Sequence, residues 1–218
     1  MLPLITLNIK TSRSTSDGEA YNYYNRYNYD VTLFTYDDQE LFIGKGSSVL
    51  YLCEKAMNEG ADIIDAFDDN HHEGIYDLLY DGDVINGTEK MKDEWEELFA
   101  ENYSFNSNIL VSDRLEILPE YQHHGYGKIV RHILHDFFSG CYGIEILHSF
   151  PLQLELFDNN EPWRAKMNYH TMNHDASQAH ASLNRCYLRS GYTQYQDTEY
   201  FYRFPDDETL DESEWEEE

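Results

Sequence analysis

One segment of the chain limits the fold classes open to it. Apolar and β-branched residues predict a strand over residues 109–118, and the pattern then changes to a helical period over residues 124–138. The helix carries apolar side chains at positions i, i+1, i+4 and i+5, namely Ile129, Val130, Ile133, Leu134, Phe137 and Phe138. Gly140 and Gly143 end it, and residues 144–150 predict the next strand. A strand, a loop, a helix and a second strand in succession indicate an α/β fold.

The loop between this strand and this helix has the chemistry of an anion site. Gly125 and Gly127 let the backbone approach a ligand closely and adopt a positive φ. The loop runs directly into a helix N-terminus, where unpaired N–H groups and the helix dipole favour a phosphate. Lys128 and Arg131 bring two of the 15 Lys and Arg residues to the start of that helix. Together these features predict an anionic ligand.

The balance of charge narrows the function. The 218 residues include 42 Asp and Glu against 15 Lys and Arg, which gives a formal net charge of −27. Phosphate backbones and anionic membranes need a positive surface, so we expect neither a nucleic-acid partner nor a membrane partner. The acidity has two readings. It serves solubility or a salt-adapted host, or it attracts a cationic acceptor such as a polyamine, an aminoglycoside or a lysine side chain.

Compartment signals are few. Cys53, Cys141 and Cys186 are an odd number of widely spaced cysteines, which predicts neither a disulfide framework nor a zinc site. Residues 1–9 lack the basic region of a signal peptide. The sequence holds no apolar run of about 18 residues, the length that a membrane span needs. We therefore expect a cytoplasmic protein in a reducing environment.

Shorter elements are expected on both sides of the central segment. In the N-terminal half, residues 2–9 predict a strand and residues 30–36 and 40–43 a hairpin. Ser47 or Ser48 can cap a helix that runs to about residue 58. Further helical pieces are expected at residues 61–67, 73–80 and 90–101.

The C-terminal half predicts one helix and one hairpin. Asp175 and Gln178 form a capping pair, and Gly191 ends the helix that follows. Its residues at helical spacing are Ala179, Leu183, Cys186 and Tyr187. A hairpin is expected at residues 192–196 and 199–204, and residues 206–218 form an acidic tail.

Two stretches resemble the GNAT superfamily of N-acetyltransferases. Residues 115–134, LEILPEYQHHGYGKIVRHIL, are similar to its acyl-CoA-binding motif Arg/Gln-x-x-Gly-x-Gly/Ala, met here by Gln122, Gly125 and Gly127. Residues 183–192, LNRCYLRSGY, resemble the family's helix that ends in a tyrosine, a few residues and Gly-Phe/Tyr. The resemblance covers about residues 108–204 and contains both motifs in the family's order.

The resemblance implies a single α/β domain with a mixed, mostly antiparallel central sheet flanked by helices. Residues 1–205 would form it, with a CoA-binding core at 105–205 and an atypical N-terminal part at 1–104. A GNAT domain usually opens with a strand, two helices and then three strands before the CoA loop. Here only one clear strand precedes Pro119 after some 60 helix-prone residues, so the acceptor half departs from the family pattern.

The resemblance also implies a mechanism with acetyl-CoA as cosubstrate and an amine as acceptor. The pantetheine arm would lie along Ile117 and Leu118, in the wedge where strands 109–118 and 144–150 part, and a backbone N–H near Leu118 could polarise the thioester. Tyr187 would protonate the departing CoA thiolate, although core packing is the alternative role for this tyrosine. The residues implied in cofactor binding are Ile117, Leu118, Gln122, His123, His124, Gly125, Tyr126, Gly127, Lys128 and Asn184.

The sequence does not single out the general base. Asp113, Glu116 and His148 are the candidates, and a solvated surface residue is the alternative for each. Strand alternation predicts that Asp113 and Glu116 face opposite sides of the sheet, so that at most one looks into the cleft.

Two questions stay open at this stage. Histidine pairs at helical spacing, such as His132 and His135, raise the question of a metal site. No HExxH motif is present, and both histidines fall on the polar side of their helix. We therefore expect no metal. The alternative to an enzyme is a catalytically inactive GNAT-like fold that serves as an acidic binding or inhibitor protein for a basic partner. The oligomeric state is undetermined, with a homodimer among the options.

Overall fold

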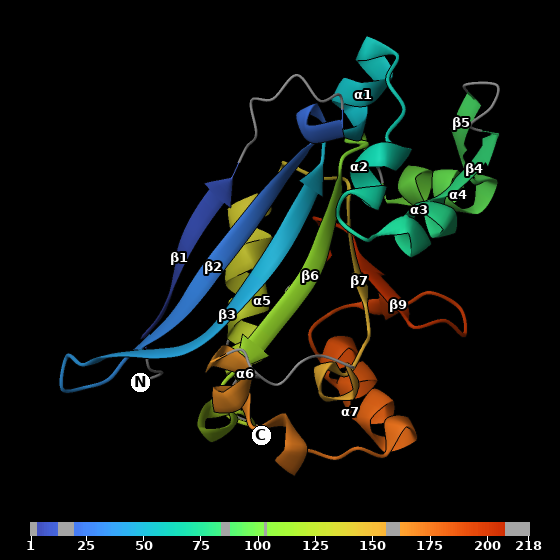
Figure 1. Cartoon of the computed structure of the whole chain (residues 1–218). Coiled ribbons are helices and arrows are strands. Elements are labelled where there is room, and N and C mark those ends of the chain that lie inside the picture. The colour runs from blue at the N-terminus through green and yellow to red at the C-terminus, as the bar shows by residue number, and fades with distance from the viewer. Residues whose placement is uncertain (1–3, 13–19, 84–87, 103, 156–161, 208–218) are drawn as a thin grey trace.

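The computed structural model describes residues 4–12, 20–83, 88–102, 104–155 and 162–207. Within them a seven-stranded sheet has the order β1-β2-β3-β6-β7-β9-β8, and β4 and β5 form a separate hairpin (Figure 1). β6 and β7 are parallel, and the other neighbours in the large sheet are antiparallel. The expected α/β fold, with a mixed and mostly antiparallel sheet flanked by helices, is confirmed.

The elements have the following bounds. The strands are β1 (Leu4–Ser12), β2 (Tyr24–Phe34), β3 (Glu40–Tyr51), β4 (Tyr80–Asp83), β5 (Thr88–Met91), β6 (Ile109–Ile117), β7 (Ile144–His148), β8 (Thr193–Gln194) and β9 (Tyr200–Arg203). The α-helices are α1 (Cys53–Glu59), α2 (Ile64–Asp68), α3 (Glu73–Leu79), α4 (Asp93–Glu101), α5 (Tyr126–Phe138), α6 (Pro162–Met167) and α7 (Ala176–Arg189). Short 3-10 helices are η1 (Ala20–Asn22), η3 (Pro119–Tyr121), η4 (Leu152–Leu154) and η5 (Tyr169–Thr171).

The prediction of a helix that starts at Ser47 or Ser48 is wrong, because both residues lie in β3. β3 continues to Tyr51, and α1 begins only after it. Val49 and Tyr51 pack into one core of the protein and Leu50 into the other, which is the two-residue period of a strand. β3 runs between β2 and β6, so its backbone is paired on both edges, and this pairing outweighs the local capping signal.

The order of elements also differs from the one that the resemblance implies. β1 leads through η1 to β2 and β3, and the helices α1 to α4 follow β3 instead of the first strand. Three strands therefore precede this helical segment, as the predicted first strand and hairpin require, but β2 and β3 are longer than the predicted hairpin strands. The C-terminal expectations are confirmed: the Asp175 carboxylate accepts a hydrogen bond from the Gln178 N–H, Gly191 has a φ of 83°, and β8 pairs with β9. Residues 208–218 of the acidic tail lie outside the described residues.

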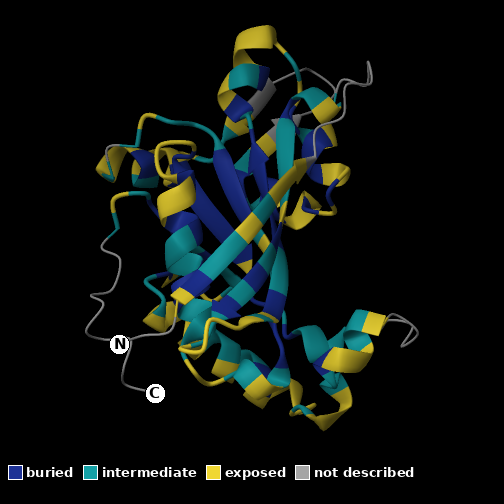
Figure 2. Ribbon diagram, turned by 90° about the vertical axis from the view of Figure 1, so that its left-hand side faces the viewer, coloured by how far each residue is buried: buried dark blue, intermediate teal, exposed yellow. Residues whose placement is uncertain are grey.

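The helices cover the two faces of the sheet with separate cores. α1 to α4 pack on one face, where Phe67, Leu79 and Trp95 contact side chains from β3, β6 and β7. α5 packs on the other face against β1, β2, β3 and β6, and α7 packs beside it on β7 and β9. Figure 2 shows that the buried residues concentrate along the central strands. Among the described helices, none is long and apolar enough to cross a bilayer.

The apolar stripe of α5 is confirmed in part. Ile129, Val130, Leu134 and Phe138 are buried, whereas Phe137 is exposed. His135 was expected on the polar side but is buried, and its Nδ1 lies 2.7 Å from the Tyr142 hydroxyl. Tyr142 comes from the loop after α5, and no local pattern in the helix indicates this long-range partner.

A buried carboxylate joins the strands at the centre of the sheet. Glu145 on β7 is 1% exposed, and the Arg203 guanidinium on β9 lies 2.6 Å from it. The same carboxylate accepts hydrogen bonds from the Ser112 hydroxyl on β6 at 2.5 Å and from the Tyr192 hydroxyl at 2.6 Å. Burial raises the pKa of Glu145, but Arg203 and the hydroxyl donors outweigh burial and hold the pKa below its ordinary value.

Replacing this carboxylate should destabilise the protein strongly. We expect Glu145→Gln to lower the free energy of unfolding by about 3–5 kcal/mol, because it leaves the charge of Arg203 buried without a counter-ion. Urea unfolding followed by circular dichroism measures the loss. Glu199→Gln, which breaks an exposed pair with His148, is the control and should cost less than about 1 kcal/mol. Equal losses in the two variants would contradict a central role for Glu145.

Candidate active site

The site begins where β6 and β7 part. Only three residue pairs join the two strands, from Ile109–Ile144 to Val111–Ile146, and β6 then continues beside β3 alone. Backbone groups of alternate residues in a strand point to opposite edges. Because the Leu118 N–H donates to the Ile43 carbonyl on β3 at 2.8 Å, the backbone groups of Ile117 point toward the edge that β7 has left.

This geometry corrects one expectation for the thioester. The N–H of Leu118 is already bound to β3, so it is not the donor that polarises a ligand carbonyl. The N–H of Ile117 lies on the open edge instead, and the Ile117 carbonyl accepts a hydrogen bond from the Gln122 side chain at 2.8 Å. Gln122 therefore ties the start of the glycine loop to the end of β6.

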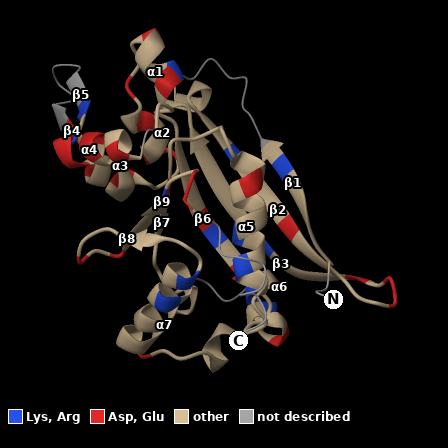
Figure 3. Ribbon diagram, turned by 180° about the vertical axis from the view of Figure 1, so that it is seen from behind, with Lys and Arg blue, Asp and Glu red and all other residues tan. Residues whose placement is uncertain are grey.

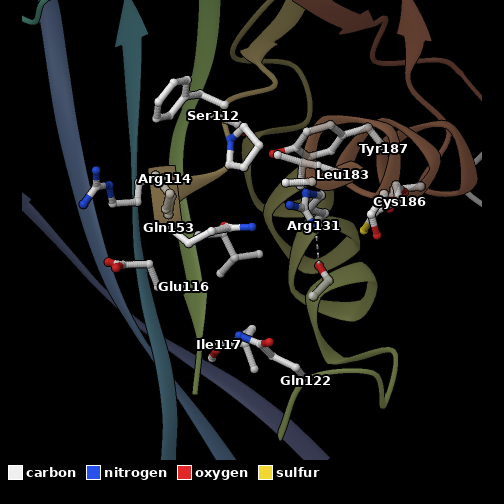
Figure 4. Close-up of a pocket in the computed structure, with 18 of the residues that line it drawn as sticks. Ser112, Arg114, Glu116, Ile117, Gln122, Arg131, Gln153, Leu183, Cys186 and Tyr187 are labelled. Carbon is white, nitrogen blue, oxygen red and sulfur yellow. Dashed lines mark hydrogen bonds between the residues drawn. The ribbon is translucent and has the colours of Figure 1, made fainter. Parts of the chain in front are cut away.

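A cavity of about 1160 Å³ lies where β6 and β7 separate (Figure 4). Its walls are the turn before α3, β6 from Val111 to Ile117, the loop from Tyr121 to Lys128 apart from His124, the segment after β7, and α7. The turn before α3 belongs to the face covered by α1 to α4, and α5 and α7 cover the other face. The cavity thus connects the two faces of the sheet through the gap between β6 and β7.

The glycine loop presents a row of backbone donors to this cavity. His123 and Gly125 have φ values of 62° and 72°, and Gly125 is the residue before the first turn of α5. In the described part of the chain, no backbone acceptor pairs with the N–H groups from His123 to Gly127. Consecutive free N–H groups at a helix N-terminus are an anion site. The prediction of a positive φ at Gly127 is wrong, because Gly127 already lies in α5. The second positive φ in the loop is that of His123.

Positive side chains gather at the same end of the cavity. Lys128 and Arg131 on α5 and Arg185 and Arg189 on α7 all line it. Figure 3 shows basic residues on α7, whereas acidic residues dominate the region of α2 to α4. The four cations that α5 and α7 bring to the cavity contrast with the formal net charge of −27 for the whole chain, which favours an anionic ligand on this side of it.

Tyr187 lies in the cavity wall opposite β6. It is 9% exposed and packs against Tyr192 and Phe201, so part of its ring serves the core. The Arg131 guanidinium carbon lies 4.8 Å from the centre of the ring. Burial raises the pKa of the Tyr187 hydroxyl, and the positive charge of Arg131 opposes that rise. A hydroxyl that keeps its proton at neutral pH can act as a general acid.

The expectation that Asp113 and Glu116 face opposite sides is wrong. The register between β3 and β6 shifts between Ser47 and Val49, so that Ser112 and Asp113 both lie opposite Ser48. Such a bulge reverses the alternation that follows it. Side chains before the bulge at Ile109 and Val111 pack with α1 to α4, and those after it at Leu115 and Ile117 pack with α5. Both carboxylates consequently lie on the face of α1 to α4.

Asp113 is held by three partners. It accepts a hydrogen bond from the Ser47 hydroxyl at 2.8 Å, lies 3.3 Å from His72 Nε2 and lies 3.8 Å from Arg26. Burial raises the pKa of Asp113, but His72, Ser47 and Arg26 outweigh burial, and the pKa lies below its ordinary value. A carboxylate stabilised in its charged form is a poor proton acceptor, and Asp113 is better suited to attract a cation.

Glu116 has one oxygen in use and one without a partner. Its Oε1 accepts a hydrogen bond from the Tyr169 hydroxyl. Its Oε2 is buried with no hydrogen-bond partner, and the residue is only 3% exposed. Glu116 lines the cavity, and Figure 4 shows it on the β6 side, across from Arg131 and Tyr187 on the helices. A buried carboxylate oxygen without a hydrogen-bond partner lowers the stability of the folded protein. Such a cost is expected at a functional site, so this oxygen is a candidate for a role in function.

His148 and Asn184 are less central than the sequence suggested. His148 lines the cavity but lies at the exposed end of β7, where its Nε2 is 3.1 Å from Glu199. Asn184 does not line the cavity, and its side chain accepts a hydrogen bond from the Ser149 hydroxyl at 2.6 Å. Asn184 therefore ties α7 to the end of β7, and its expected contact with the cofactor is not supported by its position.

Some residues of the site carry no local sequence signal. Tyr169 reaches Glu116 from η5, between α6 and α7. The Glu155 carboxylate links α6 to β6 through ion pairs with Arg114 at 2.5 Å and Arg164 at 3.5 Å. His72, which lines the cavity beside Asp113, belongs to no sequence motif. In the described ranges, no group of three or more His, Cys, Asp or Glu residues could hold a metal ion.

No protein-family model, curated protein or solved structure matches this chain. Its function is therefore inferred from the residues and geometry of the cavity.

A charge in the glycine loop should abolish ligand binding. Asp at position 125 would bring a carboxylate among the N–H groups of the loop. If acetyl-CoA, the cosubstrate that the resemblance implies, binds there, Gly125→Asp should weaken its binding by about 100-fold or more. Isothermal titration with acetyl-CoA and with desulfo-CoA measures the affinity. Gly125→Asn is the matched control, because it carries the same strain at a φ of 72° without the charge. Unchanged affinity in Gly125→Asp would place the ligand elsewhere.

Proposed function

We propose that the protein is an acyl-CoA-dependent N-acetyltransferase, which transfers the acetyl group of acetyl-CoA to a primary amine of a small or peptidic, cationic acceptor. The observation that carries the proposal is the cavity between β6 and β7, where the cations of α5 and α7 and the N–H groups of the glycine loop face Asp113 and Glu116 on β6. The GNAT-like motifs that contain Gln122 and Tyr187 support the same reaction.

The CoA end would be built by the loop and the two helices. The N–H groups from His123 to Gly127 would hold the pyrophosphate, and Lys128, Arg185 and Arg189 would neutralise phosphate charge. The open edge of β6 at Ile117 offers backbone groups to the amides of the pantetheine arm, as an added strand would use them. Because the Ile117 carbonyl is already bound to Gln122, the Ile117 N–H is the group that would donate there, either to an amide carbonyl of the arm or to the thioester carbonyl.

The chemical step needs a base, an acid and a nucleophile. The acceptor amine must lose a proton before it attacks, and the unpartnered Oε2 of Glu116 is the best-placed acceptor for that proton. As the new C–N bond forms and the C–S bond breaks, the Tyr187 hydroxyl gives its proton to the sulfur. Asp113 adds negative charge near the acceptor, in agreement with a cationic substrate.

The proposal includes a cytoplasmic location and excludes nucleic acid as a partner. The three cysteines are free, which suits a reducing compartment such as the cytoplasm. The net charge of −27 argues against nucleic acid as a partner.

A panel of amines tests the proposed activity. The purified protein should release free CoA thiol from acetyl-CoA when a polyamine, an aminoglycoside or a lysine peptide is present, and a thiol-reactive dye measures the rate. Acetyl-CoA binding without turnover of any amine would favour the alternative, an inactive GNAT-like protein that binds a basic partner. If the protein neither binds acetyl-CoA nor acetylates any amine, the assignment of CoA as its ligand is wrong.

Removing the Tyr187 hydroxyl should affect turnover more than binding. We expect Tyr187→Phe to lower kcat by about 100-fold, the contribution of a positioned general acid, with the KM for acetyl-CoA within about threefold of wild type. Steady-state kinetics on the best amine measure both constants. Unchanged kcat would move the proton donor elsewhere, for example to water.

Removing the proton-accepting oxygen of Glu116 should also lower turnover. We expect Glu116→Gln to lower kcat by about 100-fold at neutral pH, with the loss shrinking at high pH, where the amine is already neutral. Glu120→Gln, on the exposed side of η3, is the matched control and should retain wild-type rates. A larger loss in Asp113→Asn than in Glu116→Gln would assign the base to Asp113.

A further inference from the structure

Arg131 occupies an unusual position in the cavity. It lies one helical turn after Gly127 on α5, and its Nη1 donates to the Gly127 carbonyl at 3.2 Å. Its guanidinium carbon is 4.8 Å from the ring centre of Tyr187 on α7. Figure 4 shows the two side chains next to each other at the helix side of the cavity, which both residues line.

No carboxylate neutralises this guanidinium. Among the described residues, no ion pair includes Arg131, although the chain contains 42 Asp and Glu residues. Arg203, which is also buried, has Glu145 at 2.6 Å. A partly buried cation without a counter-ion costs stability. Such a cost is expected where a negative charge appears during function.

The proposed reaction brings two kinds of negative charge to the cavity, that of the CoA phosphates and that of the departing thiolate. The geometry indicates which of them Arg131 faces. The CoA phosphates would bind at the loop from His123 to Gly127, where the N–H groups are free. Negative charge from the departing thiolate would appear at Tyr187. Because the guanidinium lies over the Tyr187 ring, Arg131 is placed for the second charge.

We propose that Arg131 is a positioning residue for Tyr187, which orients its hydroxyl and stabilises the negative charge that the tyrosine carries after it has protonated the leaving CoA. The proposal rests on the proposed acetyl transfer. The amine nitrogen forms a bond to the acetyl carbon, the C–S bond breaks, and its electron pair stays on sulfur. The Tyr187 hydroxyl proton moves to that sulfur and leaves a phenolate beside Arg131. The proton released by the amine returns through solvent to Tyr187.

Other groups also surround Tyr187. Cys186 lies beside it on α7, and Tyr192 packs on its ring with the hydroxyl bound to Glu145. Arg203 lies over Tyr192, and Tyr29 on β2 is near enough to Arg131 to interact with its charge. Burial raises the pKa of the Tyr187 hydroxyl, and among the residues that the structure describes Arg131 is the positive charge that opposes the rise.

Substitutions of Arg131 test the proposal in the free protein and in turnover. Protein labelled with ¹³C at the tyrosine ζ carbon would be titrated with base in the absence of any substrate, with Tyr187→Phe assigning the resonance. We expect Arg131→Met to raise the pKa of Tyr187 by about one unit, since it removes the adjacent positive charge, and Arg131→Lys to restore most of the difference. Arg185→Met, which removes another cavity cation, is the control and should leave that pKa unchanged.

The kinetic arm separates this role from phosphate binding. We expect Arg131→Met to lower kcat by about tenfold with little change in the KM for acetyl-CoA, and Arg185→Met to raise that KM. In a Tyr187→Phe background, Arg131→Met should have little further effect, because the two residues act in one step. A raised KM with unchanged kcat, or full additivity of the two substitutions, would overturn the proposal.

The two arms also separate this proposal from the proposed function. If the wild-type protein acetylates no amine, acetyl transfer fails while the tyrosine titration still measures the coupling between Arg131 and Tyr187. If turnover is found but neither the Tyr187 pKa nor kcat responds to Arg131→Met, the role of Arg131 fails while acetyl transfer stands. Circular dichroism of Arg131→Met and Arg131→Lys checks the fold of both variants, and we expect the wild-type spectrum for each.

Discussion

The structure of the site depends on a single buried carboxylate, Glu145. It receives the Ser112 hydroxyl from β6, the Tyr192 hydroxyl and the Arg203 guanidinium from β9, all between 2.5 and 2.6 Å. These bonds tie β6, β7 and β9 together next to the end of the short register that β6 shares with β7. Beyond Ser112 the strand bulges and follows β3 alone, so the carboxylate fixes the point where the sheet opens. The cavity, its open edge and the orientation of the catalytic candidates all follow from that point.

The distribution of charge around the opening agrees with a reaction between an anionic and a cationic substrate. Lys128, Arg131, Arg185 and Arg189 line the side formed by α5 and α7, in a chain whose formal net charge is −27. Asp113 and Glu116 lie on the opposite face of the sheet, both turned there by the bulge in β6. A cosubstrate with phosphates and an ammonium acceptor would therefore enter from different sides and meet in the gap between the strands.

Features fixed by neighbours in sequence could be predicted, and features fixed by distant partners could not. The strand and helix on either side of Gly125, the cap at Asp175 and the terminal hairpin depend on local periodicity and turn residues, and the structure contains them. The extension of β3 through Ser48 depends on pairing with both β2 and β6. The burial of His135 depends on Tyr142, which lies outside its helix.

The same distinction holds within the site. Gln122, Gly125 and Tyr187 lie in motifs that can be read from a few residues, and all three line the cavity. The common face of Asp113 and Glu116 results from a register shift between strands that are far apart in the sequence, and simple alternation gives the opposite answer.

Binding of acetyl-CoA at the opening of the sheet is the central claim, and amide chemical shifts test it most directly. Acetyl-CoA would be titrated into ¹⁵N-labelled protein while the backbone amide resonances are followed. We expect saturable shifts at the amides from His123 to Gly127 and at Ile117, at one ligand per chain. The absence of saturable shifts at millimolar acetyl-CoA, or shifts confined to the acidic region of α2 to α4, would contradict the account.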